Sequence, residues 1–154
     1  MKLSKNFSLK ELTRSQTAIR NGIINIPNQE QLVCLTALTT AVLQPIREKH
    51  GRVNINSGLR VLELNRKIGS RDSSQHVLGM AADLECPSID NLKLAQWIEE
   101  NLKFDQLILE FYEKGEPTSG WIHVSYNNQG ENRSQVRTAS RVDGKTQYTE
   151  GIHE

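Results

Sequence analysis

The chain has 154 residues, of which 36% are hydrophobic and 24% are charged, and its formal net charge is +1. This length and composition predict one globular domain over residues 1–154. The near-neutral charge argues against a nucleic acid as the main partner, because neutralising phosphates normally requires a strongly basic surface. No apolar run is long enough to cross a bilayer, so we expect no membrane insertion.

The N-terminal residues 1–6 contain no apolar segment typical of a signal peptide. We therefore expect the protein to be synthesised in the cytoplasm without a signal peptide. A target outside the membrane would then be reached by another route, such as release at cell lysis.

Capping residues predict where the first helices begin. Ser8 and Glu11 have the spacing of a capping box. Asn28 is a residue type preferred at N-caps and is predicted to cap the next, long helix. From Gln29 to about His50, apolar residues recur at helical spacing, which predicts the longest helix and the main support of the core. Pro45 lies inside this pattern and is expected to kink or break the helix.

The rest of the chain alternates between short strands and helices. Two further helices are predicted, over 62–68 and, after an N-cap at Ser88, over 89–101. Predicted strands cover 52–56, 80–84, 105–112, 121–125, 136–142 and 146–148. These elements predict an α+β fold in which a small, mostly antiparallel sheet packs against helices. We expect its core over about residues 3–126, followed by a polar hairpin or tail over about 127–154.

Two histidines and one aspartate form a candidate metal site. His76 and Asp83 flank Gly79, whose freedom at positive φ would let the chain turn back, and His123 lies on the predicted strand 121–125. If the strands that carry Asp83 and His123 are neighbours, these side chains can converge on one ion. Two His and one Asp would leave the fourth position of a hydrolytic zinc open. Taken singly, each residue favours an ordinary core or surface role, and only their joint placement at strand ends favours a metal site.

Other residues could complete or extend this site. Hydrolysis with a metal needs a general base, and Glu110 lies on an apolar strand where a carboxylate requires a partner or a function. A structural ion pair is the alternative role for Glu110. Arg60 follows a strand end and could bind a substrate carboxylate with two hydrogen bonds, or could be a solvated surface residue. Cys86 lies near Asp83 and could be a ligand, although a structural role is the simpler interpretation.

The segment Ser74 to Asp83 matches in full the S-x-H-x-x-G-x-A-x-D motif of the M15 zinc peptidases. This family includes D-alanyl-D-alanine carboxypeptidases and phage endolysin peptidases. Trp121-Ile122-His123 resembles its W-x-H signature, and Ser57-Gly58-Leu59-Arg60 is similar to its S-G-x-R segment. The resemblance extends over about residues 3–126, is strongest to the small phage-type subgroup, and implies a hedgehog/DD-peptidase-like fold.

The resemblance implies roles for individual residues. One Zn²⁺ per chain would be bound by His76, Asp83 and His123. The residues implied or predicted to contact substrate are Arg60, Ser74, Gln75 and Trp121, with Ser74 alternatively orienting His76. In the dipeptidase branch of the family a Glu lies three residues before the last His, but here that position is Gly120. Glu110 is therefore the best candidate for the general base.

Two functions remain open at this point. The first is a zinc peptidase that hydrolyses peptide bonds in the peptidoglycan stem peptide, as a D-Ala-D-Ala carboxypeptidase or an endolysin-type endopeptidase. Such an enzyme would be a monomer that acts on the cell wall after release, or as part of a virion. The second is a non-catalytic zinc-binding structural or virion-associated module with the same fold.

Overall fold

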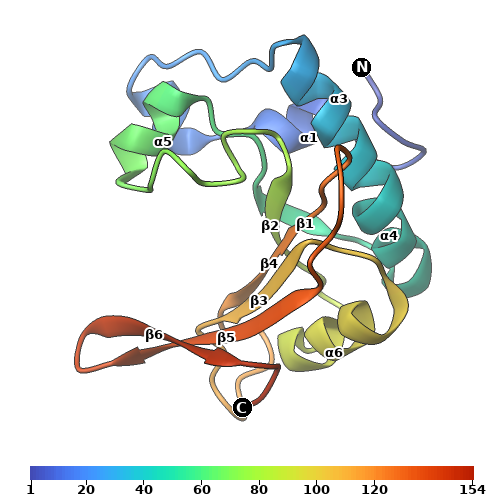
Figure 1. Cartoon of the computed structure of the whole chain (residues 1–154), viewed down its shortest axis with the longest axis vertical. Coiled ribbons are helices and arrows are strands. Elements are labelled where there is room, and N and C mark those ends of the chain that lie inside the picture. The colour runs from blue at the N-terminus through green and yellow to red at the C-terminus, as the bar shows by residue number, and fades with distance from the viewer.

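The computed structural model describes residues 1–154 and has an α+β fold, as predicted (Figure 1). Its helices are α1 (Leu9–Thr13), α2 (Gln16–Arg20), α3 (Gln29–Leu38), a π-helical turn η1 (Thr39–Leu43), α4 (Gln44–His50), α5 (Leu62–Ile68) and α6 (Asn91–Asn101). Its strands are β1 (Asn54–Ser57), β2 (Ala81–Glu85), β3 (Gln106–Glu110), β4 (Trp121–Ser125), β5 (Gln135–Val142) and β6 (Lys145–Glu150). They form one sheet in the order β1-β2-β4-β3-β5-β6, in which only the β3–β5 pair is parallel.

The two faces of the sheet differ in chemistry because strand residues alternate between them. Leu84, Leu107 and Ile122 are fully buried and join the hydrophobic core that α3, α4 and α6 contribute to. Figure 1 shows these three helices along one side of the sheet, whereas α5 and the β5–β6 hairpin project toward the other side. The face away from the core carries Asp83 and His123, which are Cα partners on adjacent strands. These two predicted ligands therefore lie on the polar face of the sheet.

The long N-terminal helix is continuous but not uniform. The N–H of Gln44 donates to the carbonyl of Thr39, which gives one wide π turn directly before Pro45. A proline lacks an N–H and its ring crowds the preceding helical turn, so a wider turn accommodates it. In place of the predicted kink or break, the structure shows a local change of helix type before Pro45. Gly51, with φ of 81°, ends the helix.

The predicted start of α6 was wrong. The helix begins at Asn91, and its N-cap is Asp90, whose carboxylate accepts hydrogen bonds from the N–H groups of Leu92 (2.7 Å) and Lys93 (3.2 Å). Ser88 instead donates to the carbonyl of His50. Aspartate and serine are about equally good N-cap residues, and the N-cap in the structure is Asp90, which directly precedes the helix.

The C-terminal segment forms the predicted hairpin and also extends the sheet. Strands β5 and β6 pair through a turn at Asp143 and Gly144, and β5 lies parallel to β3. Cys34 and Cys86 are buried, as expected for structural cysteines. None of the helices combines the length and hydropathy that a membrane span requires.

Asp105, at the entrance to β3, ties together three separate segments. Its carboxylate accepts hydrogen bonds from Nη2 of Arg133 (2.8 Å), from the backbone N–H of Arg133 (3.0 Å) and from Nε2 of Gln75 (2.9 Å). The residue is only 3% exposed. The hydrogen bonds from Arg133 outweigh burial and lower the pKa of Asp105 to about 2. This carboxylate thus holds the loop before His76 against the loop that leads into β5.

We expect Asp105→Asn to remove a pH-dependent part of the stability. A carboxyl group whose pKa is lower in the folded than in the unfolded protein stabilises the fold above its unfolded pKa, and this contribution is lost as the pH falls through the folded value. The shift from 3.8 to about 2 corresponds to about 2 kcal/mol at neutral pH. Urea unfolding should show this gap between wild type and variant closing as the pH falls from about 4 to about 2. Asp143→Asn in the exposed β5–β6 turn is the control, and a pH-independent gap would contradict the account.

Candidate metal centre and active site

The polar face of the sheet contains a cleft with a volume of about 770 Å³. Strands β2, β3 and β4, the loop after α5 and the β5–β6 hairpin all contribute residues to it. Every predicted site residue except Gln75 lines this cleft, namely Arg60, Ser74, His76, Asp83, Glu110, Trp121 and His123. Residues from four separate parts of the chain are thus brought together.

The three predicted ligands form one compact group. One ligand atom of each of His76, Asp83 and His123 lies within 4.8 Å of the others. Oδ1 of Asp83 is 3.0 Å from Nδ1 of His123 and 3.4 Å from Nε2 of His76. Ligand atoms about 2.0–2.1 Å from a tetrahedral zinc are about 3.3 Å apart, so these separations suit a shared ion.

A backbone carbonyl fixes the orientation of His76. Nδ1 of His76 is 2.7 Å from the carbonyl oxygen of Gly58, which can only accept, so Nδ1 carries the proton and donates. Nε2 is therefore the free lone pair, and it is buried without a hydrogen-bond partner. Burial lowers the pKa of His76 and favours the neutral ring that binds metals. Gly58 itself packs against the backbone of Leu12, where a side chain would not fit.

The turn that carries His76 rests on the start of α3. The side-chain amide of Gln31 donates to the carbonyl of Val77 at 2.8 Å. Gly79 has φ of 77° and lies so close that a Cβ there would be 2.7 Å from the carbonyl oxygen of Gln31. The predicted positive φ of Gly79 is confirmed, and the close approach gives a second reason for glycine at this position.

Asp83 is the central member of the group. Its side chain is 13% exposed, and it contacts both histidines and Arg60. Burial alone would raise the pKa of Asp83, but the hydrogen bond with His123 and the proximity of His76 outweigh it and hold this pKa well below its usual range. Asp83 is therefore a carboxylate, the form that binds a cation.

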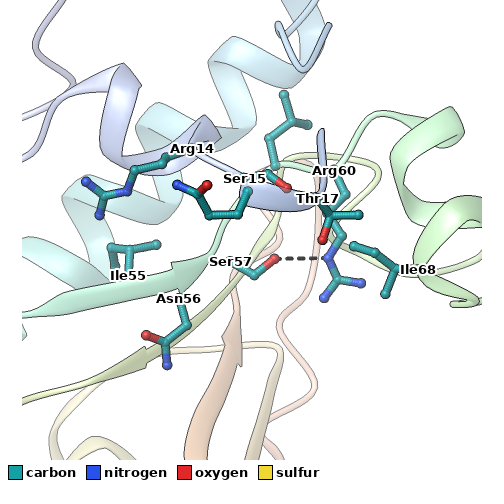
Figure 2. Close-up of a pocket in the computed structure, with 10 residues that line it drawn as sticks. Arg14, Ser15, Thr17, Ile55, Asn56, Ser57, Arg60 and Ile68 are labelled. Atoms are coloured by element: carbon teal, nitrogen blue, oxygen red, sulfur yellow. Dashed lines mark hydrogen bonds between the residues drawn. The ribbon is translucent and has the colours of Figure 1, made fainter. Parts of the chain in front are cut away.

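Arg60 lies at the rim of the group and is held by three side chains. Its Nε donates to Ser57 (3.0 Å), Nη1 to Asn65 (3.2 Å) and Nη2 to Asp83 (3.5 Å). Figure 2 shows the bond to Ser57 and the residues that line a second cavity, to which α2 contributes. The volume of this cavity is about 420 Å³. Arg60 thus forms the boundary between that cavity and the cleft.

Glu110 enters the cleft from β3. It is the Cα partner of Trp121 on β4, and both residues line the cleft. Burial raises the pKa of Glu110 and the negative charge of Asp83 raises it further, while His123, the indole of Trp121 and Arg60 act in the opposite direction. The indole N–H of Trp121 makes no well-aligned hydrogen bond, although it is near enough to influence the carboxylate. A raised pKa makes the carboxylate a stronger base, as a general base requires.

The residue three positions before His123 cannot carry a side chain with this backbone. Gly120 has φ of 65°, and a Cβ on it would overlap the carbonyl oxygen of Glu110 and the backbone of Phe111. The Glu found here in the dipeptidase branch is therefore excluded by the close contact between β4 and the end of β3. Glu110 is the carboxylate that the cleft contains besides Asp83.

Comparison with known families agrees with this geometry. The sequence model of the family described as Peptidase M15 matches residues 5–125. The chain belongs to the Peptidase M15 family. No curated protein gives a significant match to the whole sequence. The family match ends at the last residue of β4, so β5 and β6 lie outside it.

The metal group of this M15 peptidase fits a zinc ion. M15 peptidases are zinc-dependent, and the donor set of two imidazoles and one carboxylate is a set that zinc accepts. Nε2 of His76 supplies an independent indication, since a buried lone pair without a partner is costly unless something binds it. Cys86 belongs to the hydrophobic core and not to the metal group.

Ser74 and Gln75 have different surroundings although they are adjacent. Ser74 lines the cleft, and its Oγ accepts a hydrogen bond from the N–H of His76 at 3.3 Å. This contact supports an orienting role for Ser74. The side chain of Gln75 is bonded to Asp105 and is not among the residues that line the cleft.

Several residues of the site have no signal in the sequence. Asn65 holds Arg60 from α5, and Arg137 and Tyr148 line the cleft from β5 and β6. Asn65 is fully buried, which the structure shows and the sequence does not indicate, because asparagine is usually exposed. Arg137 and Tyr148 lie at the cleft because β5 pairs with β3, and the sequence does not indicate this pairing.

We expect Gly120→Ala to be much more destabilising than Gly144→Ala. Both glycines have positive φ, which alone costs an alanine about 1 kcal/mol. Gly144 has open space around it, whereas a Cβ at Gly120 overlaps the Glu110 and Phe111 backbone. Urea unfolding should therefore give a loss of about 1 kcal/mol for Gly144→Ala and about 3 kcal/mol or more for Gly120→Ala. Equal losses would show that β4 does not press against the end of β3 in this way.

Proposed function

We propose that this M15 peptidase hydrolyses peptide bonds in the peptidoglycan stem peptide, as a D-Ala-D-Ala carboxypeptidase or an endolysin-type endopeptidase. One Zn²⁺ per chain would be held by His76, Asp83 and His123. The observation that supports a catalytic rather than a structural role is the position of Glu110. A buried carboxyl with a raised pKa lies in the same cleft as the metal group, and a purely structural site has no need of it.

The ion would supply Lewis-acid polarisation of the scissile carbonyl and of the attacking water. The protein's part is to hold the ligands in place before the ion arrives. The Gly58 carbonyl fixes the ring of His76, and the β2–β4 pairing places Asp83 opposite His123. Ligands that are already oriented cost little further ordering when they bind.

In this proposal Glu110 moves the proton. Its carboxylate takes a proton from the attacking water and then gives that proton to the nitrogen of the leaving amine. The raised pKa of Glu110 makes its carboxylate a stronger base than an ordinary glutamate, which favours the first transfer, from the water. Trp121, the cross-strand partner of Glu110, lines the same cleft.

Arg60 is proposed to bind a carboxylate of the substrate. A guanidinium has five N–H groups, and three of the hydrogen bonds of Arg60 go to Ser57, Asn65 and Asp83. Because Arg60 lines the cleft, its remaining N–H groups are proposed to donate to the substrate carboxylate. Substrate contacts of Ser74 and Trp121 are proposed on the same ground, and a contact of Gln75 stays a prediction. Action on the cell wall after release or from a virion, and a monomeric state, are proposed from the phage-type resemblance.

Glu110→Gln tests the catalytic role. The variant keeps the shape of the side chain but cannot take a proton, so we expect peptide release from purified peptidoglycan to fall by about 100-fold or more. Released peptides are identified and quantified by mass spectrometry, which also reports the bond that is cut. Zinc content, measured on the same preparations, should not change. Glu113→Gln in the exposed β3–β4 loop is the matched control.

Two results would contradict the proposal in different ways. A zinc-loaded wild type that releases no peptide from any peptidoglycan would indicate the non-catalytic zinc-binding module. A Glu110→Gln enzyme with full activity would instead leave the peptidase function intact and exclude Glu110 as the base.

A further inference from the structure

The β5–β6 hairpin contributes to the cleft although it lies outside the residues that match the family. The match covers residues 5–125, whereas Arg137 of β5 and Tyr148 of β6 line the same cleft as the metal group. The hairpin projects beside the polar face of the sheet in Figure 1. It can therefore affect substrate binding in a way that the family assignment does not describe.

The sheet register places Arg137 in the same row as the metal ligands. Asp83 pairs with His123, His123 pairs with Ile108, and Ile108 pairs with Arg137. Cross-strand partners point to the same face, so Arg137 lies on the cleft face, two strands beyond His123. Arg60 contacts Asp83 from the other end of this row. The two arginines therefore lie on opposite sides of the metal group.

The spacing suits an extended peptide. Adjacent strands are about 4.8 Å apart, so β5 is about 10 Å from β4. About three residues of extended peptide span that distance. A short peptide with its scissile bond at the metal group could thus contact Arg60 on one side and Arg137 on the other.

Arg137 has no strong partner within the protein. Its Nε is 4.0 Å from Oε1 of Glu150, a side chain that is 86% exposed, and its guanidinium makes no hydrogen bond. Arg133 and Arg66, by contrast, each make short hydrogen bonds to a carboxylate. Arg137 is half-buried, so its charge is less screened than that of a fully solvated arginine.

The neighbours of Arg137 leave room for a ligand. Ala139, two residues along β5 on the same face, is small and pairs with Glu110 on one side and Tyr148 on the other. Tyr148 is 50% exposed, and its ring borders the cleft beyond Ala139. The space in front of β5 is thus bounded by an aromatic ring and contains a guanidinium that can bind a carboxylate with two hydrogen bonds.

We infer that Arg137 binds a second carboxylate of the substrate, on the side of the metal group opposite to Arg60. The substrate class is then a peptide with a free carboxylate on each side of the scissile bond. This inference rests on the proposed peptidase function, and it assigns the second carboxylate to the D-Glu residue of the stem peptide.

Binding of two stem peptides tests the inference without cleavage. The peptides differ only in the α-carboxyl group of D-Glu, which is free in one and amidated in the other. Both are titrated calorimetrically into the zinc-loaded Glu110→Gln protein, with Arg137 retained or changed to Gln. We expect the protein with Arg137 to bind the free carboxylate about 10- to 100-fold more tightly than the amide. Arg137→Gln should bind both peptides equally.

Matched variants locate the effect. Arg141→Gln, on the same strand and face but stacked over Phe111, should keep the full preference. Arg137→Lys, which keeps the charge but loses the planar fork, should keep part of it. Arg60 and Arg71 are the other arginines that line the cleft. The inference would be overturned by a preference that survives in Arg137→Gln, that disappears in Arg60→Gln or Arg71→Gln instead, or that is absent from the protein with Arg137. Failure of the proposed function is distinguished by wild-type enzyme that binds the free peptide with this preference and does not cleave it.

Discussion

The buried carboxylate of Asp83 is the group on which the site depends. A charge with only 13% of its side chain exposed is costly unless its surroundings compensate it. Here two imidazoles and one guanidinium surround it. Two of these groups are held by further partners, His76 by the Gly58 carbonyl and Arg60 by Asn65. The charge of Asp83 also helps to raise the pKa of Glu110, the second carboxyl of the cleft.

One sequence pattern specifies both the core and the site. Along β2 and β4, Leu84 and Ile122 face the helices, and the residues between them, Asp83 and His123, face the cleft. A slip of one residue in this register would exchange the two sets, placing charged ligands in the core and apolar side chains at the metal group. The burial of the core therefore enforces the geometry of the ligands. The β5–β6 hairpin continues the same row to Arg137.

The sequence predicts those parts of the site whose residues lie within a short segment, and fails where distant segments must pair. The ligands were predictable because His76, Gly79 and Asp83 lie within one short motif, and strand alternation places His123. Arg137 was not predictable, since its position depends on a parallel β3–β5 pairing between distant segments. The exclusion of a side chain at Gly120 depends on a backbone contact that composition does not reveal. Ser88 was predicted as an N-cap in place of Asp90 because both residue types cap helices well.

X-ray absorption spectroscopy at the zinc edge, on protein purified without added metal and then loaded with one equivalent of Zn²⁺, tests the central claim most directly. The account predicts a four-coordinate ion with two imidazole nitrogens and two oxygens at about 2.0–2.1 Å, one oxygen from Asp83 and one from water. The imidazole scattering should halve in His123→Ala and remain complete in His153→Ala. Sulfur scattering at about 2.3 Å, or a spectrum that His123→Ala leaves unchanged, would contradict a metal centre built around Asp83.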